Sequence, residues 1–284
     1  MKLRHAVPYL IMIASAVVIL MAFQMWKLSV TDNNIPKFYV DEDILEISVE
    51  DGVETYLQGI TAQDDRDGDV TDTIVVEKYG QIGDNDEFIV TYAAFDKSGN
   101  VAKYRRTVRF KDYVSPHFSL HAPLMFLYGR DVSVEKYVHV IDVIDGDISH
   151  KIKPTLISQV PLSSEGIHQM MFRITNSMGD TVELQLPVEI YPTGKYDASL
   201  TLKDYLVYLP KGSSFNAEDF LGTFTHHDMS ISLDNGVPMN LKLMISGSVN
   251  TDVKGVYPVT YTVSYERGQY TYSAVSKLIV IVEG

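Results

Sequence analysis

Residues 88–110 read FIVTYAAFDKSGNVAKYRRTVRF, which is the pattern of two β-strands joined by a turn. The run from Phe88 to Phe95 is rich in β-branched and aromatic residues, which favour strands, and the turn is built on Gly99-Asn100. The returning run alternates, so that one face carries Ala102, Tyr104, Arg106, Val108 and Phe110, and the other carries Lys103, Arg105 and Arg109. This predicts a hairpin with one face on a core and one face in water.

Three landmarks around this hairpin recur about eighty positions farther along the chain, in the same order. The pairs are IPKF (35–38) with SPHF (115–118), DDRDGDV (64–70) with DVIDGDI (142–148), and DKSGN (96–100) with NSMGD (176–180). A third copy is weaker: GVYPVTYTV (255–263) resembles the strand before the turn, and ERGQ (266–269) takes the place of the turn, but the Asp-Gly-Asp element is missing. The sequence therefore predicts a repeated unit of about 80 to 90 residues.

Many short strands in units of this size indicate β-sandwiches, and 284 residues suit two or three such domains. The junctions at Val114-Ser115-Pro116 and Tyr191-Pro192-Thr193-Gly194 contain proline, which favours extended or turn conformations. We place domain boundaries at these junctions. The predicted domains are residues 35–112, 113–193 and a divergent third domain, 194–284.

The N-terminal segment 6–26, AVPYLIMIASAVVILMAFQMW, carries no charge, and as a helix it would span roughly 31 Å, about one bilayer core. Lys2 and Arg4 precede it, so the positive-inside tendency predicts a cytoplasmic N-terminus (1–5), a transmembrane helix (6–26) and a linker (27–34). The alternative is a cleaved signal peptide with its cleavage site at Ala14-Ser15-Ala16, although the apolar run continues through that site. Both interpretations place the remainder of the chain outside the cell membrane.

The Asp-x-x-Asp-Gly-Asp element, the tyrosine-containing strand and the DKSGN turn together resemble the bacterial Ig-like domain family of Gram-positive surface proteins and some pesticidal crystal proteins. The match is close over Asp64–Val70 and Val90–Val101, and Thr91–Asn100 is its most specific piece. The second copy carries Asn176 and Asp180 at its turn, and the third is similar only in outline. The resemblance implies an all-β fold of three tandem Ig-like β-sandwich domains after one N-terminal transmembrane helix. It also implies a location at the cell surface, but it does not identify a ligand.

Several carboxylates crowd the first copy and make a candidate Ca²⁺ site, since Ca²⁺ takes six to eight oxygen ligands. The candidate ligands are Asp64, Asp65, Asp67, Asp69 and Asp96. The alternative is that these residues shape a loop through hydrogen bonds to nearby backbone N–H groups. In the second copy Val143 replaces a carboxylate, which weakens the expectation of calcium there.

The sequence contains no motif for a catalytic nucleophile, a phosphate-binding loop or a zinc protease, so we expect no enzyme. His226-His227 is the only histidine cluster, and neighbouring strand residues point to opposite faces, so we expect a solvated loop rather than a metal site. The net charge of −13 disfavours nucleic acid as a partner. The absence of cysteine excludes disulfides and thiol chemistry.

These features predict a single-pass protein of the cell membrane with extracellular C-terminal domains. We expect it to act as a binding or spacer module at the cell surface, with an envelope protein, surface protein or glycan as its partner. One alternative is an adhesin or carbohydrate-binding protein whose site lies in residues 194–284. A second alternative is a cell-wall-processing enzyme or its accessory subunit, which the missing motifs disfavour.

Overall fold

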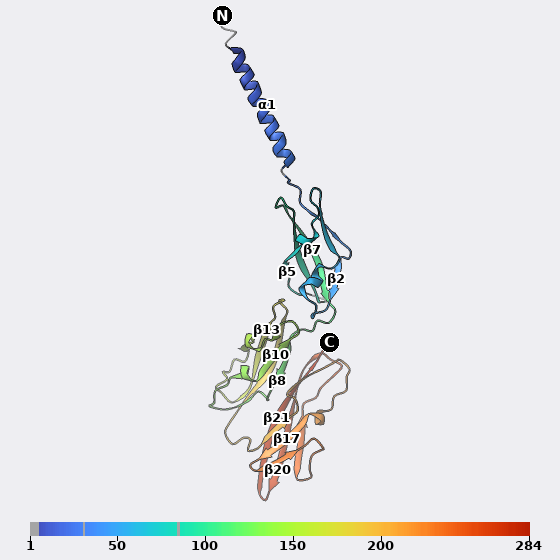
Figure 1. Cartoon of the computed structure of the whole chain (residues 1–284). Coiled ribbons are helices and arrows are strands. Elements are labelled where there is room, and N and C mark those ends of the chain that lie inside the picture. The colour runs from blue at the N-terminus through green and yellow to red at the C-terminus, as the bar shows by residue number, and fades with distance from the viewer. Residues whose placement is uncertain (1–5, 31, 84–85) are drawn as a thin grey trace. The chain divides into compact units, whose positions relative to one another are not determined.

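The computed structural model describes residues 6–30, 32–83 and 86–284. Strands dominate it, and a single α-helix, α1 (Ala6–Val30), precedes them in the described part of the chain (Figure 1). The helix contains the predicted segment 6–26 and continues to Val30, because Lys27–Val30 hold neither glycine nor proline. By length and composition, Tyr9–Lys27 is able to cross a membrane, and all of its side chains are exposed.

The first sheet pair occupies residues 37–110 and consists of a three-stranded and a four-stranded sheet. The three-stranded sheet has the order β1-β3-β4, with β1 Lys37–Val40, β3 Ile60–Asp64 and β4 Gly68–Asp69. The four-stranded sheet has the order β2-β7-β6-β5, with β2 Ile44–Ile47, β7 Val101–Phe110, β6 Glu87–Phe95 and β5 Val75–Tyr79. The expected hairpin is therefore β6–β7, and its alternation is confirmed because Ala102, Arg106, Val108 and Phe110 are buried.

The second sheet pair lies within residues 117–191 and is built in the same way. Its three-stranded sheet has the order β11-β10-β8, with β8 His117–Leu120, β10 Val138–Asp142 and β11 Gly146–Asp147. Its four-stranded sheet has the order β12-β13-β14-β9, with β9 Met125–Leu127, β12 Lys153–Leu156, β13 Gly166–Thr175 and β14 Thr181–Tyr191.

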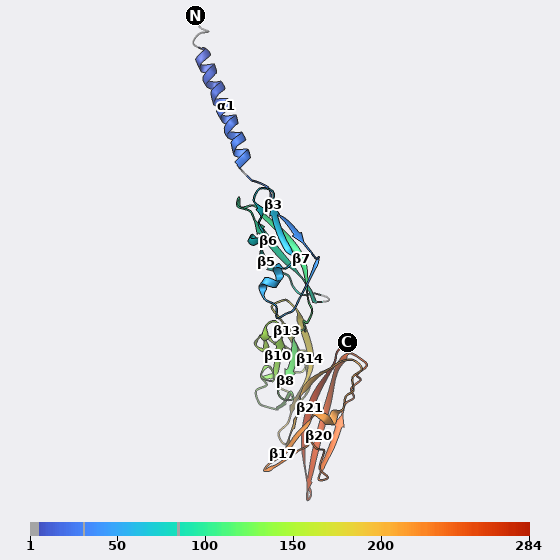
Figure 2. The ribbon, with the colours of Figure 1, turned by 45° about the vertical axis from the view of Figure 1, so that its right-hand side comes forward.

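The third sheet pair lies within residues 199–282. Its sheets have the orders β15-β17-β18 and β16-β21-β20-β19. The strands are β15 Ser199–Leu202, β16 Leu206–Leu209, β17 Leu221–His226, β18 Met229–Ser232, β19 Leu241–Ser246, β20 Gly255–Arg267 and β21 Tyr270–Val282. Figure 2 shows β17, β20 and β21 together in this part of the chain.

All three sheet pairs share one topology. In each, the first, third and fourth strands form one sheet and the second, seventh, sixth and fifth form the other, with a parallel pair between the second and the last strand. The third copy, which is weak in sequence, follows the same plan. The fold is thus all-β with several sheets, consistent with β-sandwich domains.

A buried aromatic ring occupies the same place in each copy, seven residues before the glycine of the turn: Tyr92, Phe172 and Tyr261 are all 0% exposed. The Tyr92 hydroxyl donates to the Tyr56 carbonyl at 2.7 Å, and the Tyr261 hydroxyl donates to the Ala217 carbonyl at 2.8 Å. Burial raises the pKa of Tyr261 to about 12. The phenol therefore stays protonated and keeps this hydrogen bond at physiological pH.

The chain divides into two compact units, Met1–Tyr113 and Val114–Gly284. The second unit contains the second and third sheet pairs, and one apolar cluster joins them, because Leu206 and Ile279 of the third pair pack with Phe118 and Ile190 of the second. The Tyr208 hydroxyl also accepts a hydrogen bond from the Phe118 N–H at 3.0 Å. Residues 194–284 therefore form part of the core that stabilises the second sheet pair.

A buried charge cluster reinforces this junction inside the second unit. The Glu189 carboxylate, 6% exposed, lies 2.6 Å from Lys277 Nζ and accepts hydrogen bonds from Lys195 Nζ at 2.7 Å and the Tyr196 hydroxyl at 3.0 Å. Burial opposes ionisation of Glu189, but the hydrogen bonds from Lys195 and Lys277 outweigh it and hold the pKa of Glu189 below its ordinary value.

Replacing Glu189 with glutamine should destabilise the second unit by about 3 kcal/mol, because it leaves the nearly buried Lys277 without its anionic partner. The lowered pKa also predicts a pH dependence. The stabilisation by Glu189 is complete above the unfolded pKa of about 4.3 and is lost as the pH falls through the folded pKa. Urea unfolding between pH 3 and 7 measures both effects; equal stability of wild type and Glu189→Gln at pH 7 would contradict this account.

Candidate metal centre

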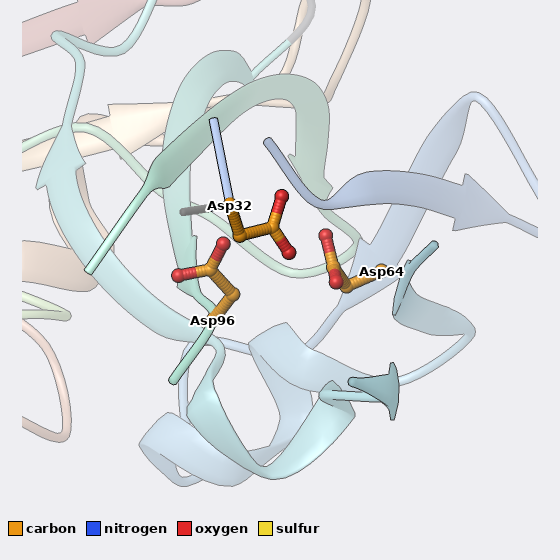
Figure 3. Close-up of side chains that lie close together, drawn as sticks. All are labelled: Asp32, Asp64 and Asp96. Atoms are coloured by element: carbon orange, nitrogen blue, oxygen red, sulfur yellow. The ribbon is translucent and has the colours of Figure 1, made fainter. Parts of the chain in front are cut away.

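Three aspartates meet at one end of the first sheet pair (Figure 3). Asp64 is the last residue of β3, Asp96 directly follows β6, and Asp32 lies between α1 and β1. Their side chains lie close together, and one oxygen from each lies within 4.8 Å of the others. The strands that carry the repeat landmarks thus bring together residues that are 32 and 64 positions apart in sequence (64 − 32 and 96 − 32).

All three side chains are withdrawn from water, since Asp32, Asp64 and Asp96 are 8%, 6% and 8% exposed. Asp64 Oδ1 accepts hydrogen bonds from the backbone N–H groups of Arg66 at 2.8 Å and Asp67 at 2.9 Å. Within the described part of the chain, no group donates a hydrogen bond to the second oxygen, Asp64 Oδ2, although it is buried. A buried acceptor without a donor is costly, so this oxygen is expected to have a ligand.

Asp32 repeats this arrangement. Its Oδ1 accepts a hydrogen bond from the Asn34 N–H at 3.0 Å, while its buried Oδ2 has no donor among the described residues. Asp96 is better satisfied, because Asn100 donates to it from the backbone N–H at 2.8 Å and from Nδ2 at 2.6 Å. The two buried oxygens that lack a hydrogen-bond donor among the described residues therefore belong to Asp32 and Asp64.

The charge of the cluster calls for a cation. Among the described residues, the Arg66 guanidinium forms an ion pair with the cluster, with its Nε 3.8 Å from Asp32 Oδ2. The three carboxylates and this guanidinium together carry a formal charge of −2. Backbone hydrogen bonds from Asp67 and Arg66 hold the pKa of Asp64 below its ordinary value, which keeps this group ionised at neutral pH. A divalent cation between the oxygens would balance the charge and supply a ligand bond to both oxygens that lack a hydrogen-bond donor.

The second sheet pair contains the corresponding site with an amide in place of one carboxylate. Asp142 Oδ1 accepts hydrogen bonds from Ile144 N at 2.9 Å and Asp145 N at 2.7 Å, as Asp64 Oδ1 does from its own turn. Its Oδ2, however, accepts a hydrogen bond from Nδ2 of Asn176, the counterpart of Asp96, at 3.0 Å. The Asn176 amide thus gives the buried oxygen Asp142 Oδ2 a partner, whereas in the first copy a cation would have to do this for Asp64 Oδ2.

The third carboxylate is also missing from the second copy. The residue eighty positions after Asp32 is Asp112, and its carboxylate instead accepts hydrogen bonds from the Ser48 hydroxyl at 2.6 Å and Val49 N at 2.9 Å. Among the described residues, the first copy is therefore the one that assembles three buried carboxylates. Oxygen ligands of this kind suit a hard cation such as Ca²⁺ or Mg²⁺.

The structure brings together two of the five predicted ligands, Asp64 and Asp96. The other three point to other partners. Asp65 is exposed and lies 3.7 Å from Lys37 Nζ, Asp67 Oδ2 accepts a hydrogen bond from Lys97 N at 2.8 Å, and Asp69 Oδ1 accepts one from Thr71 N at 2.9 Å. Hydrogen bonds from Thr71 also hold the pKa of Asp69 below its ordinary value. Asp67 and Asp69 thus shape the turn, as the alternative interpretation expected.

Sequence reasoning missed Asp32, which lies outside the predicted domain 35–112. The only available signal was its position three residues before the first repeat landmark, Ile35-Pro36-Lys37-Phe38, and Asp112 holds the matching position in a different environment. The expectation for the histidine pair was also wrong for His226. This residue is 7% exposed at the end of β17, and its ring packs 4.0 Å from the Tyr272 ring.

No protein-family model matches the chain, and no curated protein matches it in sequence. Among solved structures, it is similar to the catalytic domain and CBM51 domains of ZmpB from Clostridium perfringens (11% identity, TM-score 0.24, covering 83% of this chain and 37% of that one). It is also similar to cadherin domains 1–5 of protocadherin gamma B2, with 11% identity and a TM-score of 0.20, covering 89% of this chain and 61% of that one. A further similar structure is Drosophila N-cadherin EC1-4, with 13% identity and a TM-score of 0.21, covering 89% of this chain and 67% of that one.

The chain thus spans less than two thirds of the length of the ZmpB and protocadherin structures. TM-scores this low support no argument about fold or function. The assignment of the fold therefore rests on the strand order, and that of the site rests on its buried carboxylates.

Replacing Asp96 with asparagine should place an amide beside Asp64, as Asn176 lies beside Asp142, and remove one negative charge from the cluster. We expect the variant to lose calcium binding and to unfold at a higher temperature than wild type in chelator, by roughly 4–8 °C if the new hydrogen bond contributes about 1 kcal/mol. The free energy of unfolding of wild type should instead rise by about 2.7 kcal/mol when the free calcium concentration is 100-fold above the Kd of the site.

Calcium-titrated thermal unfolding, followed through the first unit, measures both effects. Asp65→Asn is the matched control, because it removes one nearby carboxylate that lies outside the cluster, and it should behave as wild type. A wild-type protein whose melting temperature is the same in calcium and in chelator would refute the metal assignment.

Proposed function

We propose that this chain is a single-pass membrane protein whose sheet pairs lie outside the cell, where they act as a spacer or binding module. The observation that carries the proposal is α1, a 25-residue helix whose described side chains from Tyr9 to Lys27 are all exposed. From Ala6 to Trp26 it carries no charge, so apolar side chains face outward on every side of it. Such a surface is stable in lipid and unfavourable in water.

In this proposal the three sheet pairs are three tandem Ig-like domains, residues 35–112, 113–193 and 194–284, behind a retained anchor. Their shared strand order supports this division. The protein has no catalytic role and meets an envelope protein, a surface protein or a glycan through its domains. The absence of catalytic motifs from the sequence supports a non-enzymatic role.

We further propose that Asp32, Asp64 and Asp96 hold one Ca²⁺. Two buried oxygens without a hydrogen-bond donor among the described residues and a formal charge of −2 support a divalent cation. Calcium accepts irregular oxygen cages, whereas Mg²⁺ demands near-ideal octahedral geometry. Extracellular calcium modules bind with Kd values on the order of 10⁻⁴ to 10⁻³ M, so the site would be loaded outside the cell and empty inside it.

Topology tests the anchor directly. In intact cells producing the full chain with a C-terminal epitope, external protease should remove the epitope completely, while the protein should stay in the membrane fraction after an alkaline wash. Val18→Arg should weaken this retention, because arginine at a helix centre costs about 2.5–3.5 kcal/mol on the insertion scale. An epitope that is protected until the cells are lysed would refute the proposal, and release of the chain into the medium would indicate a cleaved signal peptide.

A further inference from the structure

The three carboxylates of the cluster reach it from two sides. Asp64 and Asp96 are fixed by the first sheet pair itself, since one ends β3 and the other follows β6. Asp32 precedes β1, which begins at Lys37, and follows the end of α1 at Val30 by two positions. Two residues of chain extend at most about 7 Å. A cation bound by Asp32 is therefore tied through a very short segment to the helix that we assign to the membrane.

The other described contacts that hold Asp32 to the first sheet pair are few. Its carbonyl accepts a hydrogen bond from Asn100 Nδ2 at 3.1 Å, and its carboxylate lies 3.8 Å from Arg66 Nε, while its bond from Asn34 N is local. Against these contacts stands the crowding of three carboxylates, of which one oxygen each lies within 4.8 Å of the others. Without a cation, Asp32 is the member of the cluster that can leave without disturbing a strand.

We propose that Ca²⁺ locks the joint between the membrane helix and the first domain by holding Asp32 against Asp64 and Asp96. This inference rests on the calcium site proposed above and adds its mechanical consequence. With the ion bound, the segment after α1 is fixed to the domain; without it, the domain swivels on its anchor. External calcium then sets how stiffly the extracellular part stands on the membrane.

The absence of cysteine from the sequence makes the joint easy to label. Lys27→Cys and Arg105→Cys place spin labels at exposed positions, one at the end of the apolar span and one on β7. The distance between the two labels is measured by pulsed electron–electron double resonance on the full chain in lipid nanodiscs. The samples contain either chelator or about 10 mM calcium, which is tenfold above the Kd of the weakest extracellular calcium modules. Calcium binding to the same samples is measured by calorimetry.

We expect a narrow distance distribution in calcium that is lost in chelator. Asp32→Asn should lose the narrow distribution even in calcium, whereas Asp65→Asn should keep it. A second label pair at Lys78 and Arg105, both within the first sheet pair, should stay narrow throughout and report that the domain remains folded in every variant.

The possible failures are distinguishable. If wild type binds calcium but the distance distribution between positions 27 and 105 does not change, the calcium-locked joint is refuted while the metal site stands. The same holds if calcium narrows this distribution in Asp32→Asn as it does in wild type. If calorimetry detects no calcium binding, both the site and the joint are refuted.

Discussion

Two carboxylate oxygens, Asp32 Oδ2 and Asp64 Oδ2, are buried without a hydrogen-bond donor in the described part of the chain, and the candidate site depends on them. Burying an ionised oxygen is tolerated only when an opposite charge or a donor compensates for it. Arg66 supplies one positive charge, and the cluster keeps a surplus of two negative charges. The fold holds at least Asp64 and Asp96 in place, because the turns that position them also pair the strands.

The repeat itself shows two solutions to this constraint. Asp64 and Asp142 occupy equivalent turns and receive equivalent pairs of backbone hydrogen bonds, but Asn176 donates an amide hydrogen bond to Asp142 where Asp96 offers another carboxylate. The first and second copies therefore differ in which part of the chain they adjoin. The first copy places its charged end next to α1, and the second shares an apolar core and the Glu189–Lys277 pair with the third.

Much of this architecture could be predicted from the sequence, because local patterns determine it. The alternation of residues 101–110 predicted the buried face of β7, including Arg106, whose guanidinium donates to the carbonyls of Glu42 and Gln58. Two members of the metal cluster lay in the repeated landmarks. Asp32 could not be found, because its role depends on a long-range approach to Asp64 that no local spacing encodes. The shared core of the second unit was likewise invisible, since Leu206 and Ile279 look like ordinary strand residues.

The most direct test of the central claim is a crystal structure of the protein at neutral pH with calcium. We predict one ion about 2.3–2.6 Å from Asp32 Oδ2, Asp64 Oδ2 and an Asp96 oxygen, and none between Asp142 and Asn176. A cluster with no ion, in which two carboxylate oxygens approach to about 2.5 Å and share a proton, would contradict the account.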